Sequence, residues 1–333
     1  MSNGRYFDSK AIGSSLLGTC IVSVDPLTIC TDRAIADVKP SSFMETGKIF
    51  EDLVEETFGG KEFFWDKYFR SDLKTFPETN SEKTGLKNIL QMFENENTLQ
   101  ADIENGYVYT NPDKAGNVKL NDKYINRHRC LDQIKAHGYR RPIIAPTWEK
   151  IEIMLERFKR FPFEFMGNIF SVETWIAEYA ETLFQVDYFW SSEGASCRAK
   201  FDMIWIVEIE DIVYAIPFDL KVTADDVQGE KSFGAFVGNW RKKYIWQSKH
   251  YHEGFQLWCE ENGYVPHNQI HYLIQESEFP QITNCWALEP RELTALDAPY
   301  RQALPVIQSW IDAGRPARGY MKQITVNRYG KEW

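Results

Sequence analysis

Two apolar, strand-like runs within residues 197–221 constrain the fold of this chain more than any other feature. The first run contains Asp202, and the second ends in Asp219, Leu220 and Lys221. Successive residues of a strand point to opposite faces, so Asp219 and Lys221 share one face and Leu220 points to the other. A turn near the middle of the segment would pair the runs as a hairpin and bring the two carboxylates together.

Two carboxylates beside one ammonium group suit the metal-assisted hydrolysis of a phosphodiester. Carboxylate oxygens are the hard ligands that Mg²⁺ prefers, and a lysine beside them can orient or activate the attacking water. Strand ends also carry aspartate and lysine simply because they are solvated, and a short motif is easily matched by chance. Further residues must decide between these two interpretations.

Three other segments carry residues that could belong to such a site. Gln247 and Tyr251 are four apart and share one face of an expected helix. Glu181 precedes the run of residues 182–190, and Glu51 lies one turn into a helix that Gly47 opens. His250 and His252 flank Tyr251 but do not share a helix face, so we expect them at the surface or in a groove rather than on a metal.

Taken in order, these residues resemble the PD-(D/E)XK nucleases, and within them the RecE-type (exonuclease VIII-like) and RecB-nuclease-like branch. The residues that carry the resemblance are Gly47, Glu51, Glu181, Asp202, Asp219, Leu220, Lys221, Gln247 and Tyr251. The resemblance covers residues 40–60 and 145–333, including the closing segment 301–320. It departs at position 51, where the branch usually has histidine.

The resemblance implies an α/β (α+β) fold with a restriction-endonuclease-like core, a central mixed β-sheet flanked by helices, and an N-terminal helical insertion. We expect an arm at 1–40 and a nuclease domain at 41–333. Within that domain, 59–146 would be a variable insertion, because it is polar and rich in Asn, Lys, Glu and Gly, and 147–333 would be the catalytic core.

Periodicity and turn signals predict the elements of that core. Helices are expected at 43–58, 147–160, 173–181, 237–262 and 290–314, and strands at 182–190, 197–207, 212–221, 267–275 and 284–288.

The resemblance also implies roles for individual residues. The catalytic set would be Asp202, Asp219, Lys221, Gln247 and Tyr251, and the ligands of Mg²⁺ or Mn²⁺ would be Asp202, Asp219, the Leu220 carbonyl, Glu181 and Glu51.

Charge and cysteine content bound the function further. The net charge of −10 argues against a general nucleic-acid binder, so basic residues must gather in one channel if DNA is the partner. Basic groups flank the expected site in sequence, and the DNA contacts predicted there are Arg198, Lys200, Arg241, Lys242 and Lys243. None of the 6 cysteines has C-x-x-C spacing, so neither zinc nor the iron–sulfur cluster of some RecB-like relatives is expected.

The function expected from this pattern is a Mg²⁺-dependent exodeoxyribonuclease that acts on linear duplex ends in recombination. The resemblance implies a single-strand annealing protein as a further partner and a homo-oligomeric ring. No apolar run is long enough for a membrane span and no signal-peptide core is present, so a cytoplasmic protein is expected. The alternatives are an endonuclease or nickase of the same fold, and an inert DNA-binding or protein-interaction module.

Overall fold

The computed structural model describes residues 11–14, 16–17, 42–60, 62–73, 133, 136–137, 140–165, 167–224 and 244–313. The predicted DNA contacts Arg241, Lys242 and Lys243 lie outside these residues, as do most of the arm and the tail after 313. The chain divides into two compact units, one formed by Met1–Gly59 with Ile153–Trp333 and the other by Gly60–Glu152.

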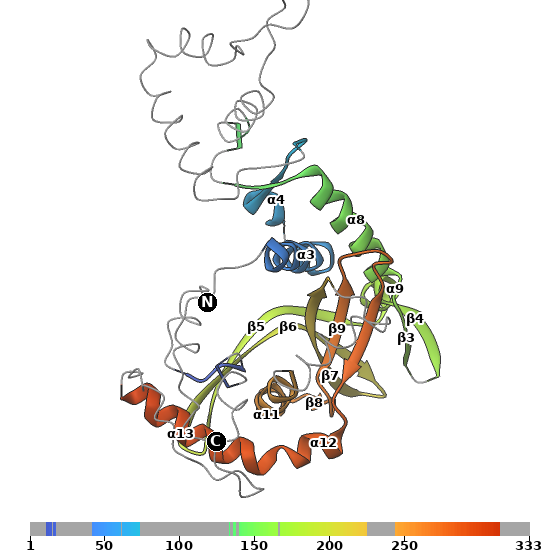
Figure 1. Cartoon of the computed structure of the whole chain (residues 1–333). Coiled ribbons are helices and arrows are strands. Elements are labelled where there is room, and N and C mark those ends of the chain that lie inside the picture. Colours follow the sequence, from blue (N-terminus) through green and yellow to red (C-terminus); the bar gives the residue numbers. More distant parts are fainter. Residues whose placement is uncertain are drawn as a thin grey trace, which may run out of the picture. The chain divides into compact units, whose positions relative to one another are not determined.

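The larger unit is built on one mixed β-sheet with the strand order β10-β9-β7-β6-β5, and β8 also pairs with β7. Strand β7 runs parallel to β8 and β9. The other neighbouring pairs, β6 with β7 among them, are antiparallel. The strands are β5 (Glu181–Ser192), β6 (Ala195–Ile209), β7 (Ile212–Thr223), β8 (Val265–Pro266), β9 (His271–Glu276) and β10 (Thr283–Ala287). Helices flank this sheet (Figure 1), so the predicted α/β class with a central mixed sheet is confirmed.

The predicted hairpin forms the central strands β6 and β7 of the sheet. Strands β6 and β7 pair antiparallel, and Ile209 lies opposite Ile212 across a two-residue turn. The turn residues Glu210 and Asp211 have φ of 50° and 62°. Positive φ at both positions is typical of the type I′ turn, whose twist matches that of the flanking strands.

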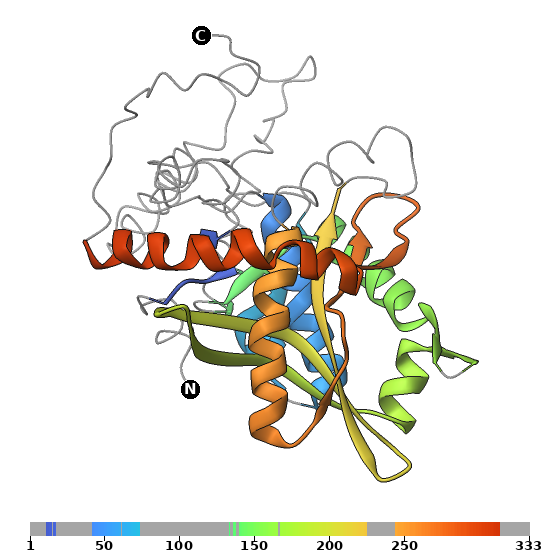
Figure 2. The ribbon, with the colours of Figure 1, turned by 90° about the horizontal axis from the view of Figure 1, so that it is seen from below.

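Helices cover both faces of the sheet. Helix α3 (Ser42–Gly59) lies on one face, and helices α11 (Ile245–Asn262), α12 (Pro290–Ala295) and α13 (Asp297–Asp312) lie on the other (Figures 1 and 2). Gly47 of α3 faces β7, where a Cβ would make an ordinary contact of 3.5 Å with the Val222 side chain. Tyr251 and Phe255 of α11 pack against Phe201 of β6, with ring centroids 5.3 and 5.5 Å apart.

The core between α11, α13 and the sheet is aromatic and aliphatic. Phe201, Phe255, Tyr300, Leu304 and Trp310 are all within 1% of complete burial. Each such side chain contributes roughly 1.5–3 kcal/mol by leaving water. This burial fixes α11 against β5 and β6, and α11 in turn places its polar side chains.

Several expected elements differ in extent from the structure. The strand expected at 267–275 is β9 (His271–Glu276), which begins four residues later, and the His267 N–H extends the pairing of β8 with β7 by donating to the Ala215 carbonyl. The helix expected at 173–181 is α9 (Val172–Glu178), and Glu181 already belongs to β5.

The expectation of a surface position for His250 is wrong, since its side chain is fully buried between α11, α13 and β6. Helix α11 packs against both the sheet and α13, so it buries side chains on more than one face. The sequence pattern does not show the second buried face.

The remaining elements include a second hairpin and the smaller unit. Strands β3 (Pro162–Phe165) and β4 (Asn168–Ser171) form the hairpin, which the sequence analysis did not predict. The smaller unit contains α4 (Phe64–Lys67) and the parallel pair β1 (Tyr68–Arg70) and β2 (Arg141–Ile143), and α8 (Ala145–Lys159) begins in it. Across the described residues, no helix is both long enough and apolar enough to cross a membrane.

Candidate active site

The sheet forks between β6 and β7, and the two predicted aspartates lie at the fork. The last registered pair of these strands is Met203 with Phe218. Beyond it, β6 continues beside β5, with one bridge between Cys197 and Ile12, and β7 continues beside β9. Asp202 and Asp219 are the next residues on the two diverging arms, so the hairpin brings them together as expected.

The Asp219 carboxylate is buried and held from two sides. Gln247 of α11 donates from Nε2 to Oδ1 at 2.7 Å. Lys221 forms an ion pair with Oδ2 and also donates to the Leu220 carbonyl at 3.2 Å. Asp219 and Lys221 therefore share one face of β7, as the i, i+2 spacing predicts.

The Asp202 carboxylate is oriented by the opposite arm of the fork. The Leu220 N–H donates to its Oδ2 at 2.9 Å. Gln185 of β5 makes a longer contact of 3.5 Å to Oδ1 and has a φ of 52°. The sequence analysis missed Gln185, because no spacing rule singles out one glutamine in a strand whose conformation is locally irregular.

Helix α3 brings a third carboxylate into this field of charge. The pKa of Glu51 is raised to about 7, chiefly by burial and also by the negative charges of Asp202 and Asp219, against the opposing effect of Lys48 and Lys221. Lys48 lies 3.4 Å from the Glu51 carboxylate. Lys48 was not predicted, although it lies one helical turn before Glu51.

Lys221 is held in its charged form. Burial alone would lower the pKa of Lys221, but Asp219 and Asp202 raise it well above the ordinary value for lysine. The ring of Tyr244, another residue that was not predicted, lies 6.0 Å from Lys221 Nζ. Burial raises the pKa of Tyr244 as well, and Asp219 adds to that effect. The charged Lys221 amine can therefore donate hydrogen bonds to neighbouring oxygens.

Two other predicted residues lie away from the carboxylates. Tyr251 is one helical turn beyond Gln247 and packs its ring in the core against Phe201. Glu181 lies at the exposed start of β5, opposite Ile206. Ile206 is four residues along β6 from Asp202, which is roughly 13 Å of strand. The structure does not bring Glu181 beside the aspartates.

The predicted DNA contacts Arg198 and Lys200 share a strand with Asp202. The three residues alternate along β6, so they point to one face of the β5–β6 arm. Lys200 Nζ lies 4.0 Å from Asp187 of β5, and both side chains are partly exposed. A basic path along this arm would lead to the fork.

The donors at the fork suit a hard divalent cation. Within the described residues, no three His, Cys, Asp or Glu side chains converge on one point, and the Asp219 carboxylate is bonded to Lys221 and Gln247. Mg²⁺ usually binds through only one or two carboxylates and completes its shell with water and substrate phosphate. Asp202, Asp219 and the Leu220 carbonyl offer such oxygens.

Comparisons with known proteins add little information about the function of this chain. No family model matches the chain, and no curated protein matches it. One similar solved structure is the crystal structure of a protein named "Putative exonuclease" from Eubacterium rectale. The two share 11% sequence identity with a TM-score of 0.39, over 99% of this chain and 93% of that one. At that TM-score the function must be argued from the residues of the site.

Proposed function

We propose that this chain is a metal-dependent nuclease of the PD-(D/E)XK type that hydrolyses phosphodiester bonds in DNA. The observation that carries the proposal is the fork of the sheet, where Asp202 and Asp219 are the first residues of the diverging arms and Lys221 is paired with Asp219. Two oriented carboxylates beside a protonated amine provide what phosphodiester hydrolysis requires.

The neighbours of the carboxylates support this assignment. Gln247 and the Leu220 N–H fix the orientation of Asp219 and Asp202, respectively. These two carboxylates and the Leu220 carbonyl would hold Mg²⁺ or Mn²⁺, with Glu51 as a further carboxylate. When bound, the ion supplies Lewis acidity and a more acidic water molecule.

Lys221 has an electrostatic role in this proposal. An amine whose pKa lies well above the ordinary lysine value keeps its proton at neutral pH. In this charged form it can donate hydrogen bonds to phosphate oxygens on which negative charge develops. Its charge also offsets part of the repulsion among the neighbouring carboxylates.

A basic path for the substrate is compatible with the acidic chain. Phosphate contacts need only a local gathering of positive charge, whatever the net charge of −10. Arg198 and Lys200 point to one face of β6 and lead to Asp202, and DNA bound along them would approach the fork. We therefore place the substrate backbone on the β5–β6 arm.

We further propose exonuclease action on linear duplex ends, in line with the resemblance of the Gln247–Tyr251 helix and the closing segment to RecE-type enzymes. The test is incubation of end-labelled linear duplex and closed circular duplex with Mg²⁺, Mn²⁺ or EDTA. Digestion of the linear DNA alone, abolished by EDTA, is the expected result.

The same experiment separates the alternatives. Rapid linearisation of closed circles would replace the exonuclease with an endonuclease, and their conversion to nicked open circles would replace it with a nickase. Absence of cleavage with either metal would favour an inert binding module. The Asp202→Asn variant, purified in parallel, controls for contaminating nucleases, because a contaminant would cleave equally in both preparations.

A further inference from the structure

The turn between β9 and β10 presents one aromatic ring to solvent. Phe279 is 91% exposed, more than any other large apolar side chain in the described part of the chain. A single exposed apolar residue needs no explanation by itself. The hydrogen bonds that fix this turn and its position near the candidate site suggest a role for Phe279.

The base of this turn is a buried polar frame. Gln275 donates from Nε2 to the carbonyls of Glu276 and Gln281 at 3.0 and 2.9 Å, and its Oε1 accepts from Thr283 Oγ1 at 2.6 Å. The Glu276 carboxylate accepts from the Ile282 N–H at 3.1 Å. Gln275 and Glu276 are each 1% exposed. Buried hydrogen bonds of this kind fix the turn, so the exposed ring stands on a preorganised support.

The turn extends the strand end that carries the candidate site. Strand β9 runs parallel to β7, with Lys221 opposite Ile274 and Thr223 opposite Glu276 (Figure 1). The Ser277 N–H donates to the Thr223 carbonyl at 2.8 Å, which ties the turn to the end of β7. Phe279 follows Ile274 by five residues, so it lies within about 17 Å of the level of Lys221 along the strands.

We propose that Phe279 is a nucleic-acid contact that stacks on an unpaired base of the substrate strand near the fork. This inference rests on the proposed function. An exposed aromatic ring binds any base through its π-face, which suits a nuclease without sequence preference. The neighbouring Glu278 is also exposed, and its negative charge disfavours a phosphate at this point. A base, rather than the backbone, is therefore the group that meets the ring.

The test measures DNA binding in EDTA, so that cleavage does not interfere. The probe is a short duplex with a single-stranded overhang that contains 2-aminopurine, followed by anisotropy and by the fluorescence of the modified base. We expect Phe279→Ala to weaken binding about tenfold and to remove the fluorescence change, whereas Phe279→Trp retains both. The matched control is Ile212→Ala, because Ile212 is also exposed beside a hairpin turn, 43%, but at the other end of β7 from Asp219.

The outcomes separate this inference from the proposed function. Equal binding by Phe279→Ala and the parent protein overturns the stacking contact, even if the parent cleaves DNA; the ring would then face another partner. Loss of binding in Phe279→Ala without any metal-dependent cleavage by the parent supports the contact and rejects the nuclease. A parent protein that does not bind the probe overturns the contact, and the cleavage assay alone then decides the function.

Discussion

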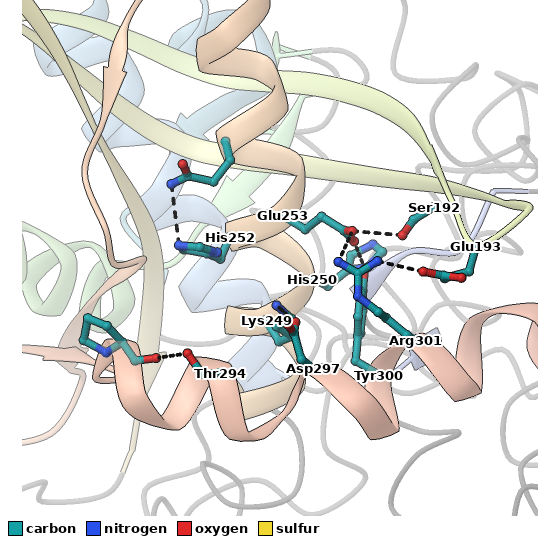
Figure 3. A network of polar contacts seen from close by, with 12 residues as sticks. Ser192, Glu193, Lys249, His250, His252, Glu253, Thr294, Asp297, Tyr300 and Arg301 are labelled. Carbon is teal, nitrogen blue, oxygen red and sulfur yellow. Dashed lines mark hydrogen bonds and ion pairs between the residues drawn. The ribbon is translucent and has the colours of Figure 1, made fainter.

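Helix α11 carries two polar clusters of opposite character. Near its start, Gln247 faces the fork cluster, which we define as Glu51, Asp202, Asp219, Lys221 and Gln247. Three and six residues further along α11, His250 and Glu253 join a second cluster with β5 and α13 (Figure 3). This second cluster, the α13 network, consists of Ser192, His250, Glu253, Tyr300 and Arg301.

In the α13 network, the polar groups complement one another. Glu253 accepts hydrogen bonds from Ser192 at 2.9 Å and from Tyr300 at 2.7 Å, and Arg301 lies 3.9 Å from it. His250 Nδ1 lies 2.9 Å from the Tyr300 hydroxyl, and Nε2 lies 3.0 Å from the Arg198 carbonyl. The network connects three elements, and a polar group that is buried with its partners specifies their arrangement.

The fork cluster is different, because like charges are crowded together in it. Its three carboxylates face one lysine of the cluster, and Lys48 lies beside them; the pKa of Glu51 rises to about 7 through burial and the neighbouring aspartates. Such an arrangement costs folding free energy and is characteristic of functional sites. The comparison teaches that a buried polar cluster indicates function when its charges repel one another, and structure when they are matched.

Loss of one fork carboxylate is expected to have the largest effect. Asp219→Ala removes a proposed metal ligand and the partner of Lys221, and we expect the cleavage rate to fall on the order of 10³-fold or more with the fold intact by circular dichroism. The matched change in the other cluster, Glu253→Ala, should instead lower the unfolding free energy by about 3 kcal/mol and leave turnover per folded molecule unchanged. If Asp219→Ala cleaves at the parental rate, the site lies elsewhere.

The amine of the fork cluster is expected to have the next largest effect. Lys221→Ala should reduce the cleavage rate on the order of 10²-fold, because it removes the amine that is paired with Asp219. Metal affinity, measured by calorimetry, should change little. Unchanged turnover would reduce Lys221 to a charge partner of Asp219 without a role in cleavage, and a large loss of metal affinity would assign it a structural role instead.

Local spacing explains which parts of the site the sequence predicted. The alternation of a strand placed Asp219 and Lys221 on one face, and the hairpin brought Asp202 beside them. The four-residue spacing on a helix placed Gln247 and Tyr251 on one side of α11. Each of these relations depends on residues within one element or one turn, so periodicity is sufficient.

The unpredicted parts depend on tertiary packing. The irregular backbone at Gln185, the approach of Tyr244 to Lys221 and the burial of His250 arise only when separate elements meet. Glu181 lies away from the aspartates, although it precedes Asp202 in the order of the motif. The order of residues in a motif does not determine their distance along a paired strand. The structure supplies the register, and the register decides which carboxylates can share a cation.

The α13 network predicts a pH dependence of stability. Burial lowers the pKa of His250 to about 4, from an ordinary 6.5. The unfolded chain therefore binds more protons between these values, and the contribution of neutral His250 to stability, complete above pH 6.5, is lost as the pH falls towards 4. At pH 5 the loss is about 2 kcal/mol.

Urea unfolding at pH 7 and pH 5 measures this loss. His250→Gln should reduce the difference, because glutamine can donate to the same carbonyls without titrating. Other groups contribute equally to the dependence in both proteins: burial lowers the pKa of His271 to about 4, and the raised pKa of Glu51 acts in the opposite direction. An equal difference between the two pH values in the parent and the variant would contradict the assignment to His250.

Substitution of Gln247, the residue of α11 that belongs to the fork cluster, is expected to have the smallest effect on cleavage. Gln247 holds the Asp219 carboxylate by one hydrogen bond of 2.7 Å, so Gln247→Ala should lower metal affinity and cleavage about tenfold, as the loss of a ligand-orienting partner commonly does. The matched control is Gln256→Ala, because Gln256 lies on the same helix and its amide contacts His252, at 3.5 Å, rather than a carboxylate of the fork cluster. We expect that variant to cleave at the parental rate. Equal losses in both would mean that any shortened glutamine perturbs α11, and the distinction between the fork cluster and the α13 network would then fail at the helix that carries both.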